Sequence, residues 1–112
     1  MANTLDFTKL KKKFLTVTLA DKDQTVIMIG TPTKAVMDEL FSLQETLNTM
    51  SDDASAEVMG DFYEVCAKVM SRNKTNKKIE KEFLEKVLDF EDIIIFFHAY
   101  MEFIKTLSAE KN

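Results

Sequence analysis

The chain has 112 residues, a length that fits one domain with its own core, and its 46% hydrophobic and 30% charged content is ordinary for a globular protein. The formal net charge of −4 argues against nucleic acid as the default partner. The single cysteine, Cys66, excludes an intrachain disulfide and a cysteine-based metal cluster. Because one thiol suits a reducing compartment and residues 1–10 lack an apolar signal segment, we expect a cytoplasmic location.

Residues 1–12 form a polar lead-in, and residues 13–30 predict a β-hairpin. Leu15, Val17 and Leu19 alternate with Phe14, Thr16 and Thr18, which is the pattern of a half-buried strand. A polar gap at 21–24 separates this strand from a second one at 25–29. An isolated hairpin is only marginally stable in water, so we expect the Leu15, Val17 and Leu19 face to pack on helices.

Residues 31–108 predict about four helices. Thr31 can cap the first, because Pro32 then occupies the first helical position. Its apolar side chains recur at helical spacing: Val36, Met37, Leu40, Phe41, Leu43, Leu47 and Met50. The polar triplet at 51–53 separates it from a second helix with the apolar row Val58, Phe62, Cys66 and Val69. A basic link at 71–78 leads to a short third helix with the apolar residues Ile79, Phe83, Leu84, Val87 and Leu88.

The last predicted helix, Asp89–Leu107, is the most apolar segment of the chain. Asp89 can cap it, with Asp92 completing an arrangement like a capping box. Successive residues of a helix are rotated by about 100°. Four polar residues therefore fall on one narrow stripe of this helix, namely Glu91, His98, Glu102 and Lys105. Such a helix is either the centre of a core or a helix with one face reserved for a partner. The run is too short and too interrupted for a membrane span.

Signals for catalysis are weak, and we expect neither an enzyme nor a bound metal or cofactor. His98 and Glu102 share a helix face, but two ligands are too few for a metal site. Cys66 and His98 could be imagined as a thiol–imidazole pair, yet Cys66 lies in an apolar row where an inert thiol is expected. The two glycines are isolated, so no phosphate-binding loop is predicted.

Protein binding is the function that composition favours, because large apolar side chains are in surplus. The chain has nine phenylalanines and seven methionines, and methionine adapts to irregular surfaces. We predict a partner-binding face on the last helix, together with self-association, made of Ile94, Phe97, Met101 and Ile104. A small acidic adaptor would use the same helix. A nucleic-acid-binding regulator would instead use the basic link with 11–13, although no recognition helix supports it.

Three segments resemble the small tail assembly chaperones of long-tailed bacteriophages that infect Gram-positive bacteria. They are KKKFLTVTLAD, IGTPTKAVMDEL and YEVCAKVMSRNKTNKKIEKEFLEKVLDFEDIIIFFHAYMEFI, and the resemblance covers nearly the whole chain. It implies a protein that coats the apolar helical tape measure protein before the tail tube polymerises round it. It also implies action in the cytoplasm of the infected host and absence from the mature virion.

The sequence therefore predicts a single domain over 1–112, mainly α with an N-terminal β-hairpin (α+β), and a disordered tail at 109–112. The resemblance adds an expectation for that tail, because many genes of the family are translated in two frames. A Glu110 codon that ends in A, followed by AAA for Lys111 and AAC for Asn112, would spell the slippery run A AAA AAC. We therefore expect a longer, frameshifted form of the chain as a further partner.

Overall fold

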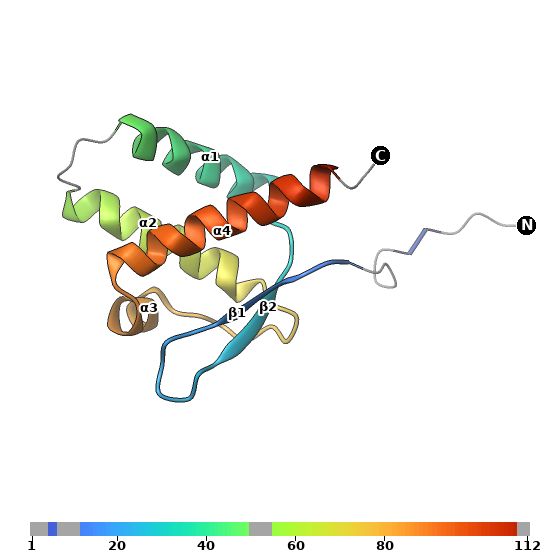
Figure 1. Cartoon of the computed structure of the whole chain (residues 1–112), viewed down its shortest axis with the longest axis horizontal. Coiled ribbons are helices and arrows are strands. Elements are labelled where there is room, and N and C mark those ends of the chain that lie inside the picture. Colours follow the sequence, from blue (N-terminus) through green and yellow to red (C-terminus); the bar gives the residue numbers. More distant parts are fainter. Residues whose placement is uncertain (1–4, 7–11, 50–54, 110–112) are drawn as a thin grey trace, which may run out of the picture.

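The computed structural model describes residues 5–6, 12–49 and 55–109, and it confirms a mainly α fold with an N-terminal β-hairpin (Figure 1). The described residues form four helices and a two-stranded antiparallel sheet. The elements are β1 (Leu15–Thr18), β2 (Val26–Ile29), α1 (Lys34–Thr49), α2 (Ala56–Ser71), α3 (Lys81–Val87) and α4 (Phe90–Ala109). Met50, the triplet 51–53 and the segment 110–112 lie outside the described residues.

The hairpin pairs as the alternation of its side chains predicts. Val17 lies opposite Ile27, and Leu15 lies opposite Ile29. Because opposite residues share a face, these side chains point together toward the helices, where both isoleucines are buried. The turn is organised by Asp21, whose carboxylate accepts hydrogen bonds from the Thr25 amide (2.8 Å) and the Thr25 hydroxyl (2.6 Å).

The far edge of β2 is occupied by the basic link between α2 and α3. The Lys74 amide donates to the Met28 carbonyl (2.9 Å), and Ile29 forms a bridge with Asn73. Asn73 is buried, and its side-chain amide donates to the carbonyls of Met70 (2.8 Å) and Lys77 (2.6 Å). The link is thus an ordered part of the fold that closes one side of the sheet.

Helix α2 is the centre of the molecule. It packs against α1, α3, α4 and β2, and Phe62 at its middle is fully buried. The rings of Phe90 and Phe97 on α4 lie edge-on to Phe62, at centroid distances of 5.7 and 5.4 Å. The sequence predicted that helix α4 is either a central core helix or a helix with one face for a partner. In the structure α4 lies at the side of the core. One face of α4 remains outside.

Helix ends match the predicted capping signals at some points and not at others. The capping box before α4 is confirmed, since the Asp92 amide donates to Asp89 (2.8 Å) and the Asp89 amide donates to Asp92 (3.1 Å). The predicted cap at Thr31 is wrong. Helix α1 begins at Lys34 because the Thr33 hydroxyl accepts from the Val36 amide (3.4 Å), which leaves Pro32 before the helix. Helix α4 continues to Ala109, so the prediction that residue 109 belongs to a disordered tail is wrong.

Candidate functional site

The outer face of α4 carries the predicted polar stripe. Glu91, His98, Glu102 and Lys105 are all exposed. Ile95 shares this face and is 60% exposed, although it is large and apolar. A single exposed apolar side chain is ordinary on a protein surface, so this face alone does not define a binding site.

The four predicted partner-binding residues fall into three environments. Phe97 is 1% exposed and packs on Phe62, so it belongs to the core and offers no accessible surface in this structure. Ile94 is half-buried against the core. Met101 and Ile104 are also half-buried, but both line an open groove. The structure therefore brings only these two of the four together at an accessible surface.

This α1/α4 groove, which runs between those two helices, has a volume of about 520 Å³. Both helices pack on α2, which leaves the groove between them. Its apolar residues are Met37, Phe41, Met101 and Ile104, and its polar residues are Gln44, His98, Glu102 and Lys105. Phe41 is 53% exposed, so its ring is available to a partner. Apolar walls with a polar rim are typical of a binding groove.

Sequence reasoning missed Met37 and Phe41 as binding residues, because it assigned both to the core stripe of the first helix. A signal was present in the helical wheel. At about 100° per residue, Phe41 projects well over 90° from the direction shared by Leu40, Leu43 and Leu47. The neighbouring helix that completes the groove could not be found in the same way, because the spacing of residues within one helix does not reveal what packs beside it.

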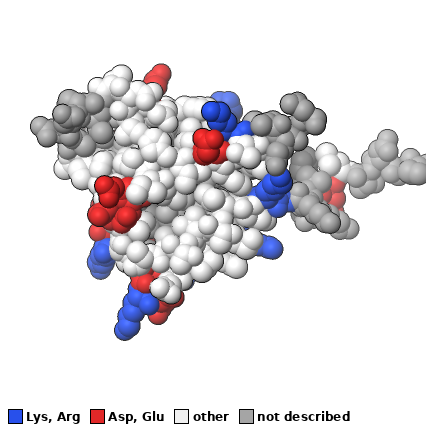
Figure 2. Space-filling view, viewed as in Figure 1, with Lys and Arg blue, Asp and Glu red and all other residues white. Residues whose placement is uncertain are grey.

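A second groove lies on the opposite flank of α4, between that helix and β1. This β1/α4 groove has a volume of about 340 Å³ and is lined along one side by residues 15–20. From α4 it is lined by Asp92, Ile95, Phe96 and Ala99. Figure 2 shows a broad uncharged area in the middle and lower part of this side of the molecule, with charged side chains at several points around it.

The groups considered for catalysis lie in different environments. Cys66 is 1% exposed, and burial raises the pKa of its thiol to about 12. His98 is exposed on the outer face of α4. Within residues 5–6, 12–49 and 55–109, no group of three or more potential metal-ligating His, Cys, Asp or Glu side chains is present. The surroundings of Cys66 are those of an inert core thiol.

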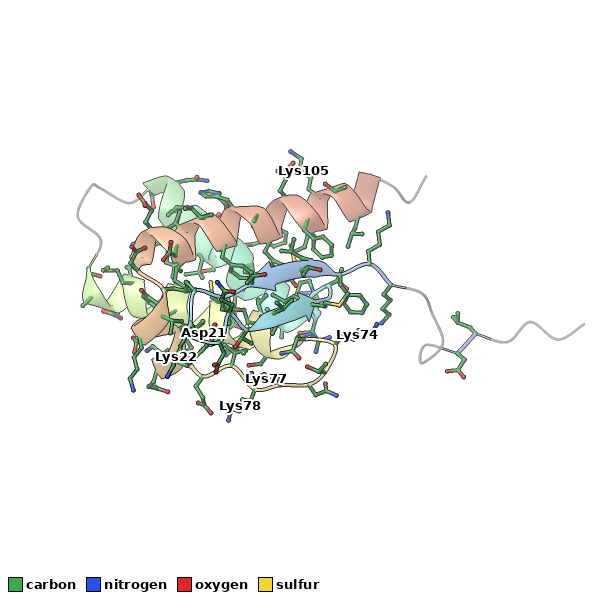
Figure 3. All side chains as sticks on the ribbon, turned by 60° about the horizontal axis from the view of Figure 1, so that its bottom comes forward. Asp21, Lys22, Lys74, Lys77, Lys78 and Lys105 are labelled. Carbon is green, nitrogen blue, oxygen red and sulfur yellow. The ribbon has the colours of Figure 1, made fainter. Side chains whose placement is uncertain are left out.

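The cations of the basic link lie on one side of the sheet. Lys74, Lys77 and Lys78 extend along the loop beneath the sheet (Figure 3). Lys74 lies 5.7 Å from the centroid of the Phe14 ring, and Lys78 forms an ion pair with Glu80 at 3.4 Å. Both cations thus have contacts within the fold.

No protein-family model, curated protein or solved structure matches the chain. In the described part of the chain, no helix combines the length and apolar character that crossing a membrane requires.

Proposed function

We propose that this chain is a non-enzymatic tail assembly chaperone that covers the apolar stripe of a helical tape measure protein before the tail tube polymerises. The resemblance of three sequence segments suggests this class of protein. The observation that carries the proposal is the α1/α4 groove, because a groove between two helices is suited to receive a third, amphipathic helix.

The groove offers adaptable apolar contacts along its length. Met37 and Met101 lie on opposite sides of it, and unbranched methionine side chains can follow the uneven surface of a partner. Phe41 supplies an aromatic anchor. A tape measure helix presents apolar residues at positions three and four apart, and these would occupy the groove in sequence.

The polar rim favours reversible binding. Glu102 and Lys105 are exposed beside the groove and carry opposite charges. They can pair with charges at the edge of an amphipathic helix, although exposed ion pairs contribute little affinity. A chaperone that is absent from the mature virion has to be released, so modest affinity per copy and many copies per tape measure suit the task. A frameshifted longer form would share the groove.

Co-expression with the tape measure protein of the same gene cluster tests the proposal. The chaperone should keep the tape measure soluble and should co-purify with it. Replacing Phe41 and Met101 by Gln should abolish both effects while leaving the melting temperature nearly unchanged, because neither side chain is fully buried. Val26→Ser provides the matched control, since Val26 is 59% exposed but lies on β2, away from the groove.

The proposal would be overturned if the tape measure stayed insoluble with the wild-type chain. It would also be overturned if the folded double variant at positions 41 and 101 remained fully active. Binding that weakens steeply with salt, and depends on the basic link instead of the groove, would favour a nucleic-acid-binding regulator.

A further inference from the structure

One edge of β1 has no strand beside it among the residues that the structure describes, and this edge is separate from the α1/α4 groove. The Leu19 amide donates to the Thr25 carbonyl (2.8 Å), so Leu19, Val17 and Leu15 occupy the hydrogen-bonded positions facing β2. In an antiparallel ladder the main-chain groups of the alternate residues, Thr16 and Thr18, then point away from β2. No residue in the described part of the chain pairs with these outward groups.

The two edges of the sheet differ in a way that singles out β1. Lys74 and Asn73 occupy the far edge of β2. Beyond the edge of β1, by contrast, is the β1/α4 groove. Ile95, 60% exposed, lies at this groove on α4, and the small Ala99 also lines it. A strand added beside β1 would cover Ile95 and would satisfy the amides and carbonyls of Thr16 and Thr18.

The charges at the two ends of the groove are of opposite sign. β1 and α4 run in opposite directions (Figure 1), so Asp92 at the start of α4 lies at the same end as the turn containing Asp21 and Asp23. Lys12 and Lys13 precede β1 at the other end. The Thr25 hydroxyl lowers the pKa of Asp21, and the positive charge of Lys77 also lowers it. Lys22 lies in the same turn, so the three carboxylates at this end outnumber two cations. The strand between these ends, residues 14–20, is uncharged.

We propose that the β1 edge binds an extended segment of another protein as a third antiparallel strand in the β1/α4 groove. The segment has apolar side chains at alternate positions, a basic N-terminal end and an acidic C-terminal end. An antiparallel strand with this polarity places its basic end beside Asp21, Asp23 and Asp92 and its acidic end beside Lys12 and Lys13. Main-chain hydrogen bonds supply affinity in this mode, and side-chain pockets and charges supply specificity.

The inference is independent of the proposed function, because the β1 edge and the α1/α4 groove lie on opposite flanks of α4. The probe is the capped peptide KKTVTITEE, added to the isotope-labelled full chain and followed by amide NMR. We expect the amide signals of Thr16 and Thr18 to shift and their hydrogen exchange to slow by about tenfold. The charge-reversed peptide EETVTITKK should bind about fivefold more weakly at low salt, with a smaller difference at high salt.

Backbone chemistry separates strand addition from nonspecific apolar contact. N-methylation of the peptide amides that face β1 should weaken binding by about tenfold or more, whereas N-methylation of the outward amides should have a much smaller effect. Thr16→Pro removes an outward N–H without removing a bond to β2, so it should also weaken binding about tenfold. Thr16→Val keeps the amide and should bind like the wild type. If Thr16→Pro does not fold, the methylated peptides still provide the test.

Three results would overturn the inference. One is the absence of a shift at Thr16 and Thr18 at millimolar peptide. Another is an equal loss of affinity whether the peptide amides that face β1 or the outward amides are N-methylated. The third is a concentration-dependent shift of the same amides without peptide, which would assign the edge to a second copy of this chain.

Discussion

The hydroxyl group of Tyr100 donates a hydrogen bond of 2.7 Å to the carbonyl of Gly30. This bond joins the middle of α4 to the residue that follows β2. Tyr100 is 1% exposed, and its ring stacks on Phe96 at a centroid distance of 5.8 Å. The bond therefore fixes the hairpin against α4, and with it the β1/α4 groove that lies between them.

Tyr100→Phe should reduce the free energy of unfolding by about 1–2 kcal/mol, because it leaves the Gly30 carbonyl without its partner while preserving the ring. Urea denaturation measures the change. Thr16→Val is the control, since it removes an exposed hydroxyl group of similar polarity and should change stability by less than about 0.5 kcal/mol. Equal stability of Tyr100→Phe and wild type would show that this bond does not hold the hairpin.

Asp21 should make the stability of the hairpin depend on pH. The Thr25 hydroxyl and amide lower the pKa of its carboxyl group in the folded state. A lowered pKa contributes stability that is fully present above the unfolded value, about 3.9, and that is lost as pH falls through the folded value. The stability difference between wild type and Asp21→Asn should therefore be constant from pH 7 to about 5 and should shrink below pH 4. A difference that grows on acidification would contradict this assignment.

Cys66 should be unreactive in the folded protein. Burial raises its pKa to about 12, and a thiol reagent attacks the thiolate. The native chain should resist an aromatic disulfide reagent at pH 8 and should react fully in denaturant. Ser42→Cys, which places a thiol at an exposed position of α1, should react at once and provides the control. Rapid modification of native Cys66 would reopen a chemical role for this residue.

Sequence patterns predicted an element correctly where its structure depends on its own residues. The alternation of Leu15, Val17 and Leu19 predicted the hairpin and its inward face. Asp89 and Asp92 predicted their capping box, because both halves of that motif lie within four consecutive residues. The start of α1 was misplaced because Thr31 and Thr33 both suit a cap, and only the bond from the Val36 amide to Thr33 decides between them.

The α1/α4 groove depends on how helices pack against one another. The sequence predicted its α4 side, through Met101 and Ile104, but not its α1 side. Phe97 has the same type of side chain as Phe41, yet it packs on Phe62 in the core while Phe41 remains 53% exposed. Which apolar side chains stay outside depends on how α1 and α4 both pack on α2. That arrangement is a tertiary property, and the periodicity of each helix does not contain it.

Methyl NMR of the methionines, on adding an amphipathic helical fragment of the tape measure protein, tests helix binding in the α1/α4 groove most directly. The signals of Met37 and Met101 should shift on binding, because both side chains line that groove. Met28, which is 37% exposed on β2, and Met70, which is fully buried, should remain unchanged. Shifts at Met28 with unchanged Met37 and Met101 signals would contradict the assignment of the groove as the binding site.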